Sequence, residues 1–142
     1  MEIIVPVHLT PVQRSLYKAV LTKNYSLLSR ITNKAVDASN PNAARKVSLN
    51  FVMIQLQKVC NHPFLFEGVE GQQDRQSDEE QLRDIIESSG KMMLLDKMLS
   101  ELKKGNHKVL IFSRMTTCLN ILEDYCYYKG WQYQRLDGSV TG

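Results

Sequence analysis

The sequence has no long apolar run and no signal-like start. None of its apolar stretches approaches the roughly 20 residues that a helix needs to cross a bilayer, so a membrane-spanning protein is excluded. Met1–Pro6 has neither a basic start nor a long apolar segment, which argues against a signal peptide. Internal repeats are absent as well. We therefore expect no membrane partner.

Cysteine is scarce, and neither sign of charge dominates. Cys60, Cys118 and Cys126 are an odd number of cysteines without CxxC spacing, which disfavours disulfides and a zinc site. This usage suits a reducing compartment such as the cytosol or nucleus. Eighteen basic and fifteen acidic residues give a net charge of +3, which permits a nucleic-acid partner without requiring one. The 142 residues have room for one domain with a sizeable core.

The motifs of a self-sufficient nucleotide hydrolase are also missing. Ser89–Lys91 resembles part of a phosphate-binding loop, but that loop requires GxxxxGK[ST]. Ile85 stands where the first glycine belongs, and Met92 stands where serine or threonine belongs. No DExH-type acidic motif is present to hold Mg²⁺, and no Ser/His/acid or Cys/His constellation occurs. His62, followed by Pro63 at a helix end, is predicted to be a packed and hydrogen-bonded histidine.

Helical periodicity accounts for much of the chain. Thr10 followed by Pro11 is typical of a helix start, and Asn61–Pro63 is typical of a helix end. Gly105 and Gly130 predict two further helix ends. Helices are predicted from Pro11, over about 24–31, 44–60, 78–86 and 116–129, and between Ser89–Lys91 and Gly105. The apolar residues expected to face inward are Val12, Leu16, Tyr17, Val20, Leu21, Leu49, Val52, Met53, Leu56, Val59, Cys60, Met92, Leu95, Met98, Leu99, Leu102, Cys118, Ile121, Leu122 and Tyr125.

Two apolar segments flank the last predicted helix, and both are predicted to be strands. Val109–Phe112 is a continuous apolar run, which is typical of a parallel strand covered on both faces. Trp131–Leu136 is the next predicted strand, and a strand–helix–strand order of this length predicts a parallel pair with a right-handed crossover. Glu2–Leu9 is a possible third strand. The sequence thus predicts an α/β protein whose sheet is incomplete, preceded by a mainly helical segment.

Ligands of open parallel sheets bind beyond the carboxyl ends of the strands. The first such end is Ser113–Thr117, where a helix N-terminus, two hydroxyls and Arg114 could contact a phosphate. The alternative is that Thr116 or Thr117 only caps the helix and Arg114 is a solvated charge. The second end is Arg135–Ser139, where glycine allows a nucleic-acid strand to approach closely. The alternative there is a simple turn in which the carboxylate binds its own backbone.

Five blocks of the sequence carry a family resemblance. They are Val59–Phe66, Ser89–Leu99, Lys108–Thr116, Leu122–Tyr125 and Tyr133–Gly138. In this order they resemble the start of the second RecA-like lobe of Swi/Snf-superfamily chromatin-remodelling ATPases, and the likeness covers essentially the whole chain. The two ends of the chain look most like the chromodomain-helicase-DNA-binding branch, with an imitation-switch-like assignment as the near alternative.

The resemblance implies a fold and a division of the chain. The fold would be an incomplete RecA-like lobe, with parallel strands and crossover helices, preceded by a mainly helical segment. Residues 1–66 would be the N-terminal strand and helical segment of the second motor lobe. Residues 67–88 would form an acidic surface insertion, and residues 89–142 would start the RecA-like core, truncated at the C-terminus.

The resemblance also implies a function. The chain would be a fragment of a nuclear, ATP-dependent DNA translocase that remodels nucleosomes, with a helicase C-terminal domain and hydrolase activity in the complete protein. ATP and Mg²⁺ would be cofactors of the complete motor and would not be bound by this fragment alone. Partners would be double-stranded DNA, nucleosomes and the first RecA-like lobe of the same protein. The residues implied to contact the DNA backbone are Ser113, Arg114, Thr116, Thr117, Arg135, Asp137 and Gly138.

The sequence also departs from the family pattern, and these departures limit what the chain alone can do. Arg114 stands where family members usually have glutamine. The phosphate-binding loop, the Mg²⁺-binding acids and the arginine finger are missing, so the chain alone is not expected to be catalytic. An incomplete sheet would leave apolar faces uncovered, so we expect the isolated chain to be aggregation-prone or partly molten. The alternative function is a non-catalytic α/β interaction module that binds DNA or protein.

Overall fold

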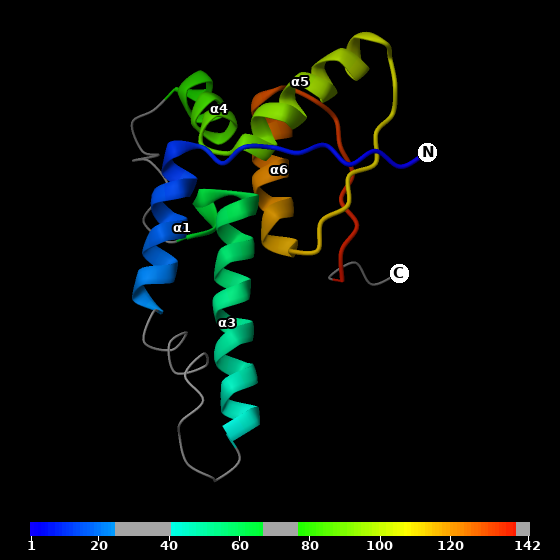
Figure 1. The fold of residues 1–142 in the computed structure, drawn as a ribbon. Helices are drawn as coiled ribbons and strands as arrows, with labels where there is room; N and C mark the ends of the chain where they lie inside the picture. The colour runs from blue at the N-terminus through cyan, green and yellow to red at the C-terminus, as the bar shows by residue number, and fades with distance from the viewer. Residues whose placement is uncertain (25–40, 67–76, 139–142) are drawn as a thin grey trace.

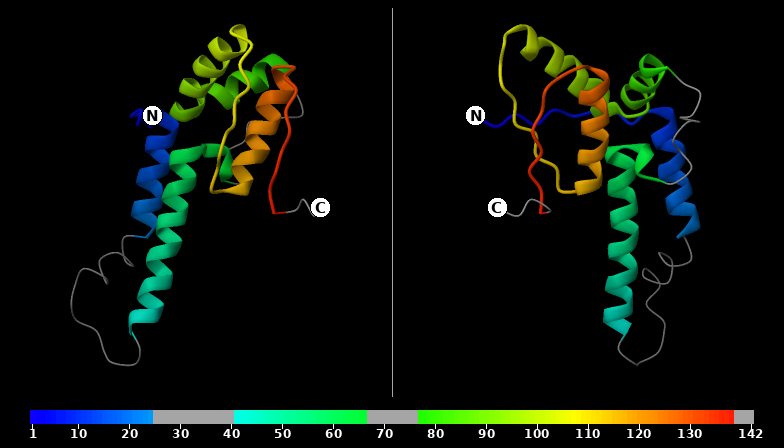
Figure 2. Two further views of the ribbon diagram at one scale, coloured as in Figure 1. Left: turned by 90° about the vertical axis from the view of Figure 1, so that its right-hand side faces the viewer. Right: turned by 180° about the vertical axis from the view of Figure 1, so that it is seen from behind.

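The computed structural model describes residues 1–24, 41–66 and 77–138, which fold into five α-helices and one 3₁₀ turn (Figure 1). The elements are α1 (Pro11–Lys23), α3 (Pro41–Asn61), η1 (Pro63–Leu65), α4 (Asp78–Glu87), α5 (Gly90–Lys104) and α6 (Thr116–Tyr128). Helices α1 and α3 lie side by side and project away from α4, α5 and α6, which gather at the other end (Figures 1 and 2). The turn η1 contacts α1, α3 and α6 and so joins the two groups.

The prediction of an α/β fold with a RecA-like sheet is wrong. Across the described ranges the backbone forms helices and turns but no strand. Residues 107–113 and 131–137 are extended and run in the same direction, but no ladder of hydrogen bonds joins them among the described residues (Figures 1 and 2). A buried parallel strand needs a paired neighbour and cover on both faces. Val109–Phe112 has neither in this part of the chain, and Glu2–Leu9 is likewise extended without becoming a strand.

The predicted helix ends are largely confirmed, because local chemistry specifies them. Thr10 caps α1, and its hydroxyl and the Gln13 side chain form a reciprocal capping box. Ser77 and Glu80 form the same arrangement at the start of α4. Helix α3 ends at Asn61, just before the proline that disfavours helical backbone, as predicted.

Helices α5 and α6 end in the same hydrogen-bonded motif. In α6, Gly130 adopts a φ of 65° and the following amide donates to the carbonyl of Cys126. In α5 the residue with positive φ is Asn106, at 56°, rather than the predicted Gly105. Asparagine tolerates this conformation better than most residues with side chains. The helix still ends where it was predicted to end, at Lys104 with Gly105 as its C-cap, and only the left-handed residue stands one position later.

The apolar core consists of two clusters. Val20, Val52 and Val59 join α1 to α3. The second cluster joins α4, α5 and α6 through Ile85, Met92, Leu99, Ile121 and Tyr125. Of the residues predicted to face inward, four are exposed instead: Val12, Leu49, Met53 and Met98.

A polar junction built around Gln13 connects the two clusters. This side chain is fully buried. Its Oε1 accepts from the amides of Thr10 at 3.0 Å and Gly90 at 3.1 Å, and its Nε2 donates to the Val59 carbonyl at 2.8 Å. Three separate parts of the chain, the segment before α1, the end of α3 and the start of α5, are therefore held by one side chain. The Ser89 hydroxyl adds a 2.9 Å bond to the Asn61 carbonyl.

His62 is packed and hydrogen-bonded, which confirms its prediction. Its Nε2 lies 2.8 Å from the Ile85 carbonyl, and its Nδ1 accepts from the Phe64 amide at 3.1 Å. This pair of contacts requires the neutral tautomer with the proton on Nε2. Burial lowers the pKa of His62, and the bond to the Ile85 carbonyl opposes that shift only in part.

Acid should therefore destabilise the fold through His62. Since its pKa is lowered in the folded state, the unfolded chain binds the proton first as the pH falls below about 6.5. The free energy of unfolding should then decrease with falling pH, by at most about 1.4 kcal/mol per pH unit for one proton. Urea melts at pH 7.5 and 5.5 measure the decrease. It should be smaller in His62→Asn and unchanged in His107→Asn, whose histidine is exposed. An equal decrease in both variants would contradict this account.

Several predictions fall partly outside the described residues. The predicted short helix at 24–31 lies outside them except for Asn24. The acidic insertion at 67–88 is described only from residue 77, and residues 78–87 of it form α4, in agreement with the predicted helix at 78–86. The division into 1–66, 67–88 and 89–142 stays a prediction.

Candidate interaction site

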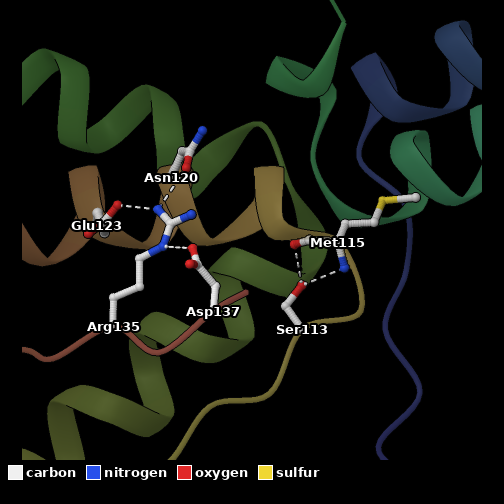
Figure 3. Close-up of polar contacts among 6 residues, drawn as sticks. All are labelled: Ser113, Met115, Asn120, Glu123, Arg135 and Asp137. Carbon is white, nitrogen blue, oxygen red and sulfur yellow. Dashed lines mark hydrogen bonds and ion pairs between the residues drawn. The ribbon is translucent and has the colours of Figure 1, made fainter. Parts of the chain in front are cut away.

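The first predicted loop lies at the start of α6. The Ser113 hydroxyl accepts from the Met115 amide at 3.3 Å and donates to the Met115 carbonyl at 2.9 Å, so it braces the turn before the helix (Figure 3). Met115 occupies the N-cap position and makes no side-chain capping bond. Thr116 and Thr117 are exposed first-turn residues rather than caps. Arg114 is exposed beside them.

The second predicted loop is tied to the side of α6. The Arg135 Nε donates to Asp137 at 2.7 Å, and its Nη1 donates to Asn120 at 2.7 Å and to Glu123 (Figure 3). Bonds from Glu123 and then Asp137 raise the pKa of Arg135. Its charge is thus matched by two carboxylates of the chain itself. Gly138 follows in open space, where an added Cβ would meet nothing within 4 Å.

The structure therefore separates the seven predicted site residues into two groups. Ser113–Thr117 lies at the N-terminus of α6, with Arg114 exposed. Arg135–Gly138 lies along the middle of α6, with its guanidinium engaged internally. Nothing in the structure tests DNA contact by these residues, and their assignment stays a prediction.

Several polar contacts around α5 and α6 were not predicted from the sequence. The Lys91 ammonium donates to the Asn61 side chain at 2.8 Å, and the Asn61 amide lies 3.5 Å from the Met115 sulfur. These contacts join the start of α5 to the end of α3 and the first loop. Nearby, burial raises the pKa of the Cys118 thiol, so this cysteine is a weak nucleophile.

A second unpredicted group joins α5 to the end of α6. Burial would raise the pKa of Asp96, but bonds from Lys129 at 2.7 Å and Tyr125 at 2.8 Å hold it below its usual value. Burial, and then the Asp96 carboxylate, raise the pKa of Tyr125. The Lys129 ammonium also lies 5.5 Å from the centre of the Trp131 ring. Sequence spacing gave no signal for this group because its members come from different elements.

An apolar surface lies on the two extended segments next to α6. The exposed fractions of Val109, Leu110, Ile111 and Phe112 are 43%, 84%, 39% and 91%, which is the alternation of an extended backbone. Tyr133 and Leu136 of the second segment are also exposed. We name these six residues the exposed strip. Exposed apolar groups of this kind mark interaction surfaces more often than isolated exposed residues do.

Two other kinds of site find no support in the described ranges. No group of three or more histidines, cysteines or acids is placed to hold a metal ion among these residues. No helix there has the length and apolar character needed to cross a membrane.

Comparison with known proteins gives one family and several relatives. The family of class II histone deacetylase complex subunits 2 and 3 matches residues 1–141. The chain is 40% identical over 141 residues to the CHD3-type chromatin-remodeling factor PICKLE of Arabidopsis thaliana. It is 40% identical over 149 residues to human chromodomain-helicase-DNA-binding protein 9 and 44% identical over 149 residues to zebrafish (Danio rerio) chromodomain-helicase-DNA-binding protein 8. Each match covers 99% of this chain but only 9%, 5% and 6% of the relative, in that order.

These findings correct the family resemblance drawn from the sequence. The matched family is one of deacetylase-complex subunits, and the described residues contain no sheet, so the assignment to the second RecA-like lobe of a Swi/Snf ATPase is wrong. The terms helicase C-terminal domain, hydrolase and ATP-binding have no support for this region. The predicted nuclear location is confirmed by the family and the relatives, one of which is named as a chromatin-remodeling factor. The predictions about ATP and Mg²⁺ remain untested.

Proposed function

Because the chain belongs to the family of class II histone deacetylase complex subunits 2 and 3, we propose that it is a non-catalytic docking unit of a nuclear chromatin-modifying assembly. The observation that carries this proposal is the exposed strip. Leu110, Phe112 and Leu136 are each more than four-fifths exposed, although burying such side chains contributes about 1.5–3 kcal/mol each. These residues lie on the two extended segments that precede and follow α6, where a protein partner could cover them.

Co-fractionation of the native protein with deacetylase activity tests the proposal. An epitope-tagged native protein should elute from nuclear extract in high-mass fractions that contain histone deacetylase activity. Phe112→Ser should move the tagged protein to lower-mass fractions, because the lost side chain is exposed in the free chain and buried in the assembly. Phe51→Ser on α3, another exposed phenylalanine outside the strip, is the matched control and should elute like wild type. Co-elution that survives Phe112→Ser would contradict the proposal.

Contact with the DNA backbone is the second candidate function, and one observation favours it. The first turn of α6 has no side-chain cap, and exposed Arg114, Thr116 and Thr117 surround its free amide groups. Unpaired amides at a helix N-terminus attract phosphate. The engaged guanidinium of Arg135 makes the second loop the weaker half of the predicted DNA site.

DNA binding should therefore respond differently to the two arginines. In the native protein, Arg114→Ala should weaken binding about equally for all sequences and reduce the slope of log K against log salt by about 0.9, the value for one phosphate contact. Arg135→Ala should leave the slope unchanged, because that charge is already matched by Glu123 and Asp137. Salt titrations of fluorescently labelled duplex DNA measure both slopes. An unchanged slope in Arg114→Ala would remove this residue from the site.

A further inference from the structure

We propose that His62 is a proton switch at η1: a proton added to its Nδ1 detaches the turn η1 from the end of α4 while both helix groups stay folded. The inference goes beyond the proposed docking function and does not depend on it. It concerns a local opening, whereas the acid effect described above concerns the stability of the whole fold. The position of η1, the bonds of the ring and the surroundings of the ring support it.

The turn η1 is the apolar link between the two helix groups. Phe64 and Leu65 pack against the cluster of α4, α5 and α6. Phe66, directly after the turn, packs against the cluster of α1 and α3. His62 is the N-cap of this turn. A change at this one side chain therefore acts where the two clusters meet.

The ring of His62 holds the turn on one side and α4 on the other. Its Nδ1 accepts from the Phe64 amide at 3.1 Å, and this bond caps the turn. Its Nε2 donates to the Ile85 carbonyl at 2.8 Å, and the Ser88 hydroxyl oxygen lies 3.3 Å from the same nitrogen. Ile85 is itself a buried member of the cluster of α4, α5 and α6. Only the neutral ring with its proton on Nε2 satisfies both backbone bonds.

Protonation of the ring conflicts with this arrangement. A proton taken up from water would go to Nδ1, the nitrogen without one. Nδ1 would then be a donor facing the Phe64 amide, which is also a donor. His62 is only 2% exposed, so the new charge would also lack solvation by water. Both costs are removed when the ring turns out toward water, and that movement breaks its bonds to Phe64 and Ile85.

In the described part of the chain, no charged side chain is placed to accept the new proton. The turn η1 has no titratable side chain. The charged residues of α4 nearest in sequence are Asp84 and Glu87, and on α3 the nearest is Lys58. Lys91 of α5 donates to the Asn61 side chain instead. The pKa of the ring is shifted by burial and by a backbone carbonyl, and none of these charges is among the causes.

The opening should stay local, because the other polar contacts between the helix groups do not titrate. The junction around Gln13 is built from an amide side chain and backbone groups. The Ser89 hydroxyl adds its bond to the Asn61 carbonyl. None of these groups gains or loses a proton between pH 5 and 8. The start of α5 should therefore remain fixed to α1 and α3 when η1 opens.

Amide hydrogen exchange at pH 7.5 and 5.5, corrected for the intrinsic rate at each pH, tests the switch. Protection factors of the Phe64, Phe66 and Ser88 amides should fall by up to about tenfold, the limit for one proton and an open-state pKa of about 6.5. The amides of Asn24 and Lys129, at the ends of α1 and α6, should keep their protection. An equal fall at all five amides would mean that the whole fold opens, and unchanged protection at η1 would mean that the ring does not control it. Either result overturns the inference.

Two variants and the ring itself provide the controls. His62→Asn keeps an oxygen that can accept from the Phe64 amide but cannot titrate, so protection at η1 should no longer depend on pH. His107→Asn removes an exposed histidine and should leave the pH dependence unchanged. Nitrogen-15 shifts of the wild-type ring need no variant and should place the proton on Nε2 at pH 7.5. A proton on Nδ1 at that pH would overturn the inference even if His62→Asn does not fold.

Discussion

Gly90→Ala should destabilise the fold by about 3 kcal/mol, at the upper end of the range for an overpacked site. An added Cβ would lie 2.0 Å from the carbonyl oxygen of His8 and 3.0 Å from a methyl carbon of Val7. The closest of these atoms is backbone, so a side-chain rotation cannot relieve the clash. The segment before α1 would have to move away from α5, and the bond from the Gly90 amide to Gln13 would break with it.

The control for this substitution is Gly138→Ala. An added Cβ there meets nothing within 4 Å, and the residue does not have positive φ. Urea melts followed by far-ultraviolet circular dichroism should show a large loss of stability for Gly90→Ala and a change within about 0.5 kcal/mol for Gly138→Ala. Equal stabilities would mean that the N-terminal segment does not pack against α5 in solution.

Gln13→Glu should cost on the order of 3 kcal/mol at neutral pH, although the two side chains have almost the same shape. One carboxylate oxygen can still accept from the amides of Thr10 and Gly90. The other would face the Val59 carbonyl, to which Gln13 now donates at 2.8 Å, so two acceptors would oppose each other in a fully buried site. A buried polar group that loses its partner costs more than the net value of the original bond.

The cost of Gln13→Glu should depend on pH, which separates it from a general packing defect. The protonated carboxyl can donate to the Val59 carbonyl, so the folded state should raise the pKa of the introduced group above the unfolded value of about 4.3. Stability relative to wild type should then be highest below that pH and fall as the pH rises through the folded pKa. Gln57→Glu, at an exposed glutamine of α3, should show no such dependence. A pH-independent cost would contradict the geometry of the junction.

The helices could be predicted from the sequence because their ends are local. Thr10–Pro11, Ser77 with Glu80, and Gly130 each supply a cap within a few residues of the helix they delimit. The junction could not be predicted in this way. Gln13 was not among the residues predicted to face inward, and its burial follows from Val59 and Gly90, which lie far away in the sequence.

The prediction of a sheet was wrong because it rested on composition alone. Val109–Phe112 and Trp131–Leu136 have the composition of buried strands, and the periodicity reports only that such residues favour burial. It cannot report what covers them. In this chain both segments are extended, and Trp131 packs against the core while Val109–Phe112, Tyr133 and Leu136 are exposed. Most of the apolar residues that suggested a buried sheet therefore form the proposed docking surface. At the candidate site, the exposed position of Arg114 agrees with the alternative in which it is a solvated charge. The internal pairing of Arg135 could not be predicted, because it depends on Glu123 and Asn120 of α6.

Amide hydrogen exchange of the free chain, resolved by residue, tests the central claim most directly. The account predicts slow exchange within α5 and α6, whose amides are hydrogen-bonded and packed, and fast exchange at residues 109–112 and 132–136, whose backbone is extended and unpaired. Protection of these two segments to the level of α6 would show that they are already paired with each other. The exposed strip would then not be open to a partner, and the docking function proposed for it would fail.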